Sequence, residues 1–145
     1  MLYALLIFII LLTYNNLLFI EKFYNQEDNR NFDKYRKFSK KLKTKYGSCN
    51  YTPSYIIEGL PQISWNGYFI NDLFIKEKYR KKGYGTQLIK NLIKISRKEG
   101  KLHLISQVIA DNKGAVKLHE KLGFVIYNKG LNKNNELVLI YVYFL

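Results

Sequence analysis

The sequence of 145 residues predicts an α/β domain in which helices flank a β-sheet. Two strand–helix pairs follow one another along the chain, and a long apolar run at the C-terminal end adds a further strand. The first pair comprises residues 68–75 and a helical pattern that begins near Gly85, and the second comprises residues 102–109 and 111–122. Strands that alternate with helices are typical of α/β folds.

The first strand, Tyr68–Ile75, is a dense apolar and aromatic run of strand length. It leads into YRKKGYGTQLIKNLIK, residues 79–94, where three basic residues and two glycines precede apolar positions at helical spacing. Gly100 is well placed to end this helix. A strand, a glycine turn and a helix in this order aim unpaired backbone N–H groups at one point, where the helix dipole adds positive potential. The pattern therefore predicts an anion site, most often for a phosphate.

The glycine turn alone allows three interpretations. A dinucleotide-binding fingerprint would need a third glycine where Leu88 stands, and a P-loop would need Gly-Lys-Ser/Thr, which this turn lacks. Gly83 and Gly85 could also only relieve backbone strain in a tight strand–helix connection. The third interpretation depends on a second motif.

That motif follows the strand at residues 102–109. It is DNKGAVKLHEKLGF, residues 111–124, in which Asp111 or Asn112 can cap a helix that Gly123 ends. The ordered pair of R-x-x-G-x-G after one strand and N-x-x-A-x-x-x-(Tyr or His)-x-x-x-G-F after the next resembles the GNAT superfamily of N-acetyltransferases. These enzymes transfer an acetyl group from acetyl-coenzyme A to amines.

The resemblance covers about residues 68–143 and implies a mixed, splayed central sheet. The pantetheine arm of acetyl-coenzyme A would lie where strands 68–75 and 102–109 separate. The resemblance further implies that the main chain of Leu73, Phe74 and Ile75 pairs with pantetheine, and that Asn112 lies near the cofactor. A cradle for the pyrophosphate would be formed by the backbone of residues 80–86. These residues are Arg80, Lys81, Lys82, Gly83, Tyr84, Gly85 and Thr86.

Acetyl transfer needs a group that removes a proton from the amine and one that protonates the departing thiolate. The family most often places a tyrosine at the acid position, and this sequence has His119 there. Relatives similar to phosphinothricin acetyltransferases also carry L-H-E at this point. A histidine on the inner side of a helix is also often only a hydrogen-bonded core residue. His119 is therefore the predicted acid, with a structural role as the alternative.

The predicted base is Asp72. Asn71, where acetyltransferases similar to the spermidine/spermine enzyme carry a glutamate, cannot accept a proton at neutral pH. A water chain, or no dedicated base, are the alternatives, and Asp72 could equally bond to a neighbouring loop.

The net charge of +13 would suit nucleic acid, an anionic membrane or an acidic substrate. The lysines are scattered, however, and the densest cluster, residues 34–45, is interpreted as the solvated face of a helix. With only 11 acidic residues, a polyamine acceptor is disfavoured. The single cysteine, Cys49, permits no internal disulfide and fits a reducing compartment, which favours a cytoplasmic catalytic domain. No metal-ligand spacing is visible.

Residues 1–20, MLYALLIFIILLTYNNLLFI, are long and apolar enough to cross a bilayer. No small-residue cleavage site follows, so a cleaved signal peptide is not predicted. We slightly favour a membrane anchor, with the lysines that follow on the cytoplasmic side and residues 21–145 forming the N-acetyltransferase domain. The alternative is that residues 1–20 supply a strand and part of a helix to the core.

The remaining elements are predicted from local patterns. A helix is expected over about residues 29–46, a strand near residues 54–58 and a short strand at residues 62–65. A short strand at residues 124–127, a polar link over 128–135 and a strong strand at 136–145 would complete the sheet.

The sequence thus predicts an acetyl-coenzyme A-dependent N-acetyltransferase that acts on a primary amine of an unidentified small molecule or protein. A homodimer is compatible with this prediction. The alternatives are a noncatalytic module of the same fold, with or without coenzyme A binding, and, less favoured, a basic nucleic-acid-binding protein.

Overall fold

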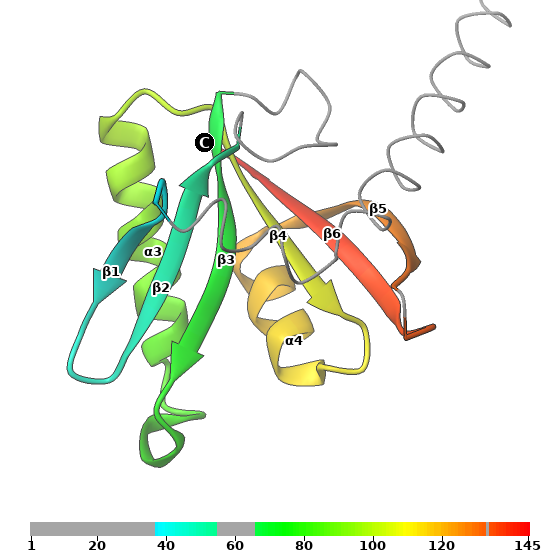
Figure 1. The fold of residues 1–145 in the computed structure, drawn as a ribbon. Coiled ribbons are helices and arrows are strands. Elements are labelled where there is room, and N and C mark those ends of the chain that lie inside the picture. Colours follow the sequence, from blue (N-terminus) through cyan, green and yellow to red (C-terminus); the bar gives the residue numbers. More distant parts are fainter. Residues whose placement is uncertain (1–36, 55–65, 133) are drawn as a thin grey trace, which may run out of the picture.

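The computed structural model describes residues 37–54, 66–132 and 134–145 (Figure 1). Their secondary structure comprises six strands, two α-helices and a short 3₁₀ helix, η3. The elements are β1 (Lys40–Lys43), β2 (Gly47–Pro53), β3 (Gly67–Ile75), η3 (Glu77–Tyr79), α3 (Tyr84–Lys98), β4 (His103–Ile109), α4 (Lys113–Leu122), β5 (Val125–Leu131) and β6 (Leu137–Phe144).

The strands form one sheet in the order β1-β2-β3-β4-β6-β5. Only the pair β3–β4 is parallel, and every other neighbouring pair is antiparallel. A right-handed crossover through α3 is the usual way to join two parallel neighbours. The predicted mixed α/β sheet is therefore confirmed.

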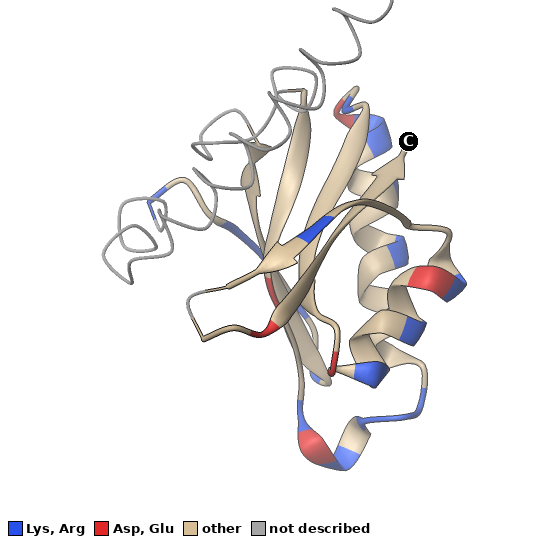
Figure 2. Ribbon diagram, turned by 90° about the vertical axis from the view of Figure 1, so that its right-hand side faces the viewer, with Lys and Arg blue, Asp and Glu red and all other residues tan. Residues whose placement is uncertain are grey.

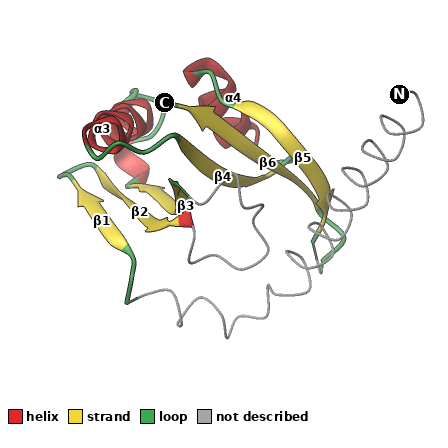
Figure 3. Cartoon of the chain, turned by 90° about the horizontal axis from the view of Figure 1, so that it is seen from above, coloured by secondary structure: helices red, strands yellow, loops and turns green. Residues whose placement is uncertain are grey.

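Both helices cover the same face of the sheet (Figure 3). The main core lies between them and the strands, and in it Ile89 and Leu92 of α3 pack with Tyr68, Leu104 and Tyr141. These side chains are almost fully removed from water. A smaller buried cluster gathers other strand residues. Its members are Phe69, Ile105, Ile140 and Val142. Successive side chains of a strand point to opposite faces, so this cluster belongs to the other face of the sheet.

The sheet is splayed between its two parallel strands. Pairing between β3 and β4 runs only from Gly67 opposite His103 to Ile70 opposite Ser106. β3 then continues to Ile75 and β4 to Ile109 without pairing to each other (Figure 1). The first four residues of β3 are buried, and its last five are only partly buried or exposed. This confirms the predicted separation of the two strands. We call the space between the unpaired ends of β3 and β4 the gap.

A β-bulge lies where the gap begins. On β2, the consecutive residues Asn50 and Tyr51 face Asp72 and Ile70, so Asn71 is an extra residue in β3. An extra residue shifts the alternation of side chains by one. Ile70 and Leu73 consequently both pack into the core beneath α3. The Asn71 side-chain amide donates to the hydroxyl of Thr52, which fixes the bulge to β2.

The predictions for the N-terminal part need correction. The helix expected at residues 29–46 is wrong for its described part, because β1 and β2 form a hairpin there. Thr44 closes this hairpin: its N–H donates to Gly47 O at 2.9 Å, and its hydroxyl accepts from the Tyr46 and Gly47 N–H groups. The alternation Lys41, Leu42, Lys43, exposed on either side of a half-buried leucine, fits a strand as well as a helix.

Of the strand expected at residues 54–58, only Ser54 is described, and it follows the end of β2; residues 55–58 lie outside the described residues. The expected strand at 62–65 and residues 29–36 lie outside the described residues. Residues 1–20, to which the membrane prediction refers, also lie outside them. Within the described ranges, no helix has the length and apolar character needed to cross a membrane.

At the C-terminal end, β6 confirms the strand predicted at 136–145. β5 is longer than predicted, because residues 128–131 of the expected polar link also pair with β6. The polar side chains of Asn128 and Lys129 obscured this strand in the sequence. Pairing with the apolar β6 supplies the stabilisation that their own β-propensity lacks.

Candidate active site

The gap exposes backbone hydrogen-bonding groups of β3. The Lys76 N–H donates to Tyr46 O at 3.0 Å, on the side of β2. Backbone groups of alternate residues point to the same side of a strand, so Phe74 also faces β2, whereas Leu73 and Ile75 face the gap. No described strand pairs with Leu73 or Ile75 on that side. An extended ligand with amide groups could therefore add to this edge as a strand does.

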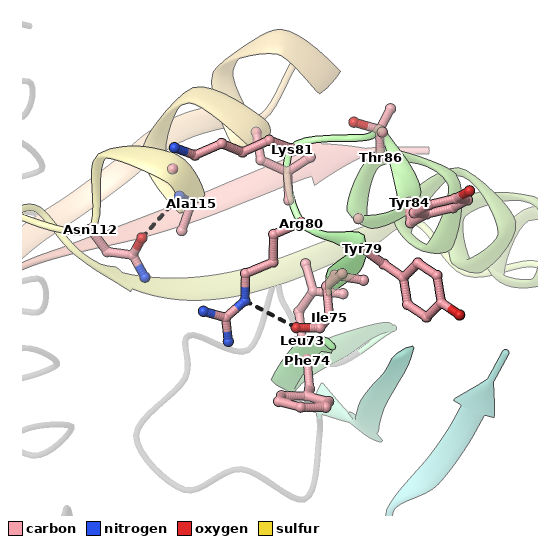
Figure 4. Close-up of a pocket in the computed structure, with 14 residues that line it drawn as sticks. Leu73, Phe74, Ile75, Tyr79, Arg80, Lys81, Tyr84, Thr86, Asn112 and Ala115 are labelled. Atoms are coloured by element: carbon pink, nitrogen blue, oxygen red, sulfur yellow. Dashed lines mark hydrogen bonds between the residues drawn. The ribbon is translucent and has the colours of Figure 1, made fainter. Parts of the chain in front are cut away.

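One side chain reaches into this region. The Arg80 side chain folds back so that its Nε donates to Ile75 O at 3.1 Å (Figure 4). The rest of its guanidinium group lies between the end of β3 and the start of α4 in this view.

The turn before α3 has an unusual backbone. Lys81 and Gly83 both adopt left-handed conformations, with φ of 57° and 83°. For a lysine this conformation costs about 1–2 kcal/mol, and strain of this kind concentrates at functional sites. A side chain at Gly83 would meet no atom within 4 Å, so this glycine is needed for its φ value and not for space. Alternating backbone conformations of this type form concave nests of N–H groups that bind anions.

The N-terminus of α3 has no side-chain cap and no acidic residue in its first turn. The first N–H bonded within the helix is that of Gln87, which donates to Gly83 O at 3.0 Å. The N–H groups of Tyr84, Gly85 and Thr86 precede it and are those that a helix leaves unpaired. The positive end of the helix dipole adds to the charge of the neighbouring basic side chains. The geometry is that of an anion site.

These features surround one cavity of about 530 Å³. All the predicted cofactor-binding residues except Lys82 line it. They are Leu73, Phe74, Ile75, Arg80, Lys81, Gly83, Tyr84, Gly85, Thr86 and Asn112. Lys82 points elsewhere, and its Nζ donates to Lys78 O at 3.1 Å.

Four further residues line the cavity and were not predicted. They are Tyr79, Gly114, Ala115 and Leu118. Ala115 and Leu118 lie on the inner face of α4, and their spacing was visible in the sequence as helical periodicity. That periodicity indicates burial and cannot indicate whether the buried face meets a core or a cavity.

Asn112 has a structural role that accompanies its place in the cavity. Its Oδ1 accepts from the Ala115 N–H at 3.1 Å and so caps α4 (Figure 4). Of the two caps that the sequence allowed, Asn112 is the one observed.

His119 lies on α4 with its side chain buried, and it is not among the residues that line the cavity. Its Nδ1 lies 2.7 Å from Ala115 O, which can only accept, so Nδ1 carries the proton. Nε2 is then the acceptor for the hydroxyl of Ser106, at 2.9 Å. The ring also packs edge-on against Phe124 and stacks on Tyr141. Burial lowers the pKa of His119, and the hydrogen bond to Ala115 O opposes this only in part.

Asp72 is exposed on β3 and does not line the cavity. Its neighbour Leu73 packs against the core beneath α3, so the side chain of Asp72 points to the opposite face of the sheet. The base role of Asp72 stays a prediction.

The matching family model identifies the class of protein. The model of the acetyltransferase (GNAT) family matches residues 49–124, more than half of the chain. The chain belongs to this family. Its members use acetyl-coenzyme A, which confirms the predicted cosubstrate at the level of the family.

Solved structures of acetyltransferases share the fold. The ribosomal-protein-S18-alanine N-acetyltransferase from Escherichia coli matches with a TM-score of 0.60 and 17% identity over 79% of this chain and 75% of its own. The Arabidopsis thaliana NAA60, solved with a bisubstrate analogue, matches with a TM-score of 0.57 and 22% identity over 68% of this chain and 64% of its own.

The NatC complex bound to Gag peptide and coenzyme A matches with a TM-score of 0.59 and 17% identity. The match covers 69% of this chain and 61% of the NatC chain. The chain therefore spans less than two thirds of the length of several of the structures it matches.

Proposed function

We propose that this chain is an acetyl-coenzyme A-dependent N-acetyltransferase that acts on a primary amine. One observation carries the proposal: the unpaired edge of β3 and the uncapped N-terminus of α3 open into the same cavity. These two features suit the two halves of the cosubstrate, because pantetheine has amides that can pair with a strand and pyrophosphate is an anion. The proposal is that acetyl-coenzyme A supplies the activated acetyl group in this cavity.

In this proposal, the backbone of Leu73 and Ile75 orients the pantetheine arm. The N–H groups at the start of α3 hold the pyrophosphate, and Lys81 adds positive charge. Arg80 must release Ile75 O if the arm is to pair with that carbonyl. Preorganised backbone donors are well suited to such a task because they need no rearrangement when the charge arrives.

Asp72 as base and His119 as acid belong to the same proposal. A neutral His119 has one N–H proton, and that proton faces Ala115 O. To act as an acid it would need a second proton at Nε2, the atom that accepts from Ser106. Burial disfavours this charged form. If the His119 ring gives a proton, the hydroxyl of Ser106 is the neighbour through which it would pass.

The test is calorimetry of the full chain with acetyl-coenzyme A, followed by turnover measurements with a panel of amines. The panel should contain amino acids, aminoglycosides and peptides with a free N-terminus. Saturable binding with turnover of at least one amine supports the proposal. Binding without turnover of any of these amines would favour the noncatalytic alternative. Affinity for DNA or RNA that falls steeply with salt, without coenzyme A binding, would favour the nucleic-acid alternative.

Lysines and arginines are spread over α3, α4 and the turn before α3 (Figure 2). Within the described residues this distribution follows the outer sides of the helices, as expected for solvated faces. It does not favour the nucleic-acid alternative over the enzyme.

Membrane attachment through residues 1–20 is a separate proposal, supported by their length and apolar character. Fractionation of the full chain tests it. Recovery in the membrane fraction, released by detergent and not by salt, supports an anchor. Recovery without detergent would instead favour the alternative that residues 1–20 join the core.

A further inference from the structure

The outward sides of α3 and α4 form one basic surface, away from the cavity. Both helices cover the same face of the sheet, so their outward sides point away from it together (Figure 3). The two helices carry seven basic residues and one acidic residue, Glu120, and Figure 2 shows the basic positions along both. Six of the seven are exposed lysines, which we call the lysine face. They are Lys90, Lys94, Lys98, Lys113, Lys117 and Lys121.

The spacing of these lysines sets them opposite the core. α3 buries five residues on its inner side. With 3.6 residues per turn, Lys94 lies opposite the centre of that buried side, and Lys90 and Lys98 lie one turn before and after it. The three lysines of α4 follow one another at the same interval of four residues. Each helix therefore carries a row of cations along its outward side.

Within the described residues, these charges have almost no partners. Lys113 Nζ lies 3.8 Å from Asp111 Oδ1, and both side chains are largely exposed. The other five lysines of the lysine face form no ion pair with a described residue. Like charges four residues apart lie side by side on a helix and lower its stability. The rows cost the fold some stability, and an anionic partner would offset that cost.

The composition of the lysine face limits the kind of partner. None of the large exposed apolar side chains of the described residues belongs to α3 or α4. The one arginine, Arg97, donates to the hydroxyl of Tyr143 at 3.3 Å. Nucleic acids are usually bound by arginine forks and by aromatic rings on which bases stack. A broad surface of lysines without such rings instead suits diffuse attraction to many negative groups, as on an acidic lipid bilayer.

Residues 1–20 point to the same partner independently of the lysine face. They are apolar and long enough to cross a bilayer. One apolar anchor combined with a basic cluster is a common way to attach a domain to a membrane, because lysines near an acidic bilayer surface add to the binding.

We propose that the lysine face docks on the surface of a lipid bilayer that contains acidic phospholipids. The contact is electrostatic, since no apolar side chain of the two helices stands ready to enter the lipid. In this orientation α3 and α4 lie between the bilayer and the sheet. The face of the sheet to which Asp72 points is turned towards the solution, where an acceptor can reach it.

The first experiment measures co-sedimentation of the full chain with vesicles of phosphatidylcholine, alone or mixed with phosphatidylglycerol, over a range of salt concentrations. We expect tighter binding to the acidic vesicles, weakened by salt. A triple variant of α3 should lose about a hundredfold in affinity for them at low salt and behave like the unmodified chain on neutral vesicles. Its changes are Lys90→Gln, Lys94→Gln and Lys98→Gln. Unchanged binding of acetyl-coenzyme A reports that this variant is folded.

The matched control removes the same charge elsewhere. Its changes are Lys41→Gln, Lys43→Gln and Lys45→Gln, all at exposed lysines of β1 and the turn after it. Leu42 packs against the core beneath α3, so Lys41 and Lys43 point to the opposite face of the sheet. The control should bind acidic vesicles almost as the unmodified chain does. An equal loss in both triple variants would mean that only net charge matters and would overturn the inference.

A second measurement reads the orientation even if residues 1–20 hold the chain on every vesicle. A fluorophore is attached to Gln87→Cys, on the outward side of α3, or to Lys43→Cys, on the opposite face, and the lipids carry a quencher on the headgroup. We expect salt-sensitive quenching at position 87 on acidic vesicles and little at position 43. Equal quenching at both positions, or none at position 87, would overturn the inference. Tighter binding to RNA than to acidic vesicles, lost in the α3 variant, would assign the lysine face to nucleic acid instead.

Discussion

The two strand–helix junctions of this domain end in opposite ways. Between β4 and α4 the chain turns briefly, and Asn112 caps the helix by accepting the Ala115 N–H. Between β3 and α3 it passes through two left-handed residues and leaves the helix without a side-chain cap, with basic residues in front of it. One helix start has a side-chain cap from its own sequence, and the other has none.

The difference extends to how firmly each helix is held. α4 is fixed by Asn112 at its start, by the contact between His119 and Ser106 inside, and by left-handed Gly123 at its end. α3 is held by a buried apolar face, which includes Leu88, Ile89 and Leu92, while its first turn faces the cavity. The start of α3 lacks the side-chain cap that Asn112 gives to α4. An anion bound there can stabilise the helix start instead.

The largest effect is expected when a negative charge is placed at the start of α3, because this tests directly whether that helix start binds an anion. We expect Gly83→Asp to weaken coenzyme A binding by up to about a thousandfold relative to Gly83→Asn, because a charge 4 Å from a phosphate costs about 4 kcal/mol near a protein surface. Asparagine and aspartate have the same shape and both tolerate a left-handed backbone. Calorimetry at low ionic strength measures the ratio.

Gly100 provides the control for this pair. It has φ of 68° and, like Gly83, open space around the position of a Cβ atom, but it lies at the other end of α3. Gly100→Asp and Gly100→Asn should bind coenzyme A equally well. An equal effect of charge at both glycines would mean that the start of α3 is not the anion site.

A second test loosens α4. We expect His119→Ala to lower the free energy of unfolding by about 2–4 kcal/mol, because it leaves a cavity and removes the partners of Ala115 O and the Ser106 hydroxyl. Urea unfolding measures this loss. The acid role adds a second expectation, a fall in turnover of about 10²- to 10⁴-fold per folded molecule with little change in coenzyme A affinity.

His119→Tyr is the variant that discriminates. If the position serves as an acid, tyrosine should restore much of the turnover that alanine removes. Ser106→Ala keeps the ring and removes only its Nε2 partner. Unchanged turnover per folded molecule in His119→Ala would take His119 out of the catalytic residues.

A smaller effect is expected at the cap of α4. Asn112→Ala should cost about 1 kcal/mol of stability through loss of the cap, and Asn112→Ser should restore most of it, because serine is also a good cap. Thermal unfolding measures both. If Asn112 also contacts the cosubstrate, both variants should lose affinity for coenzyme A to the same degree, since neither retains the amide. Loss of affinity in the alanine variant alone would mean that only the cap matters.

The smallest effect concerns pH. Burial lowers the pKa of His119 below its unfolded value of 6.5. Between these two pKa values the unfolded chain binds more protons, so stability is complete above about pH 6.5 and falls as the pH drops through the lowered pKa. The slope stays below about 1.4 kcal/mol per pH unit. Urea unfolding should show this slope in the unmodified chain and not in His119→Gln.

Glu99 does not interfere with that measurement. Its hydrogen bond from Tyr68 lowers its pKa below 4.5, so its contribution is lost only in more acidic solutions. A slope that persists in His119→Gln between pH 6.5 and 5 would assign the effect to another group.

The sequence predicted the two junctions well because their signals are local. Glycines at left-handed positions, a capping asparagine and helical periodicity are each set by a few neighbouring residues. The separation of β3 and β4 was predicted as well, but only through the resemblance to a family. The bulge at Asn71 that begins it depends on the register with β2, which no local pattern reveals.

The features that depend on contacts between distant parts of the chain could not be predicted from the sequence. The pattern over residues 40–46 suits a helix and a strand equally, and its pairing with β2 decides between them. For His119, the sequence indicated an inward position but not the partner on β4 that occupies Nε2. The stacked rings of Tyr46 and Tyr84 likewise join the β1–β2 turn and α3, which are far apart in the chain.

One feature of β2 affects how all of these variants can be studied. Cys49 is the only cysteine of the sequence and is fully buried, and burial, with a smaller effect of Asp72, raises the pKa of its thiol to about 12. Its thiolate is therefore scarce at neutral pH, and reagents that detect free thiols react slowly with such a group. In a colorimetric assay, the colour would come from released coenzyme A and not from the enzyme. A cysteine introduced at an exposed position would also be the single site for a fluorescent label.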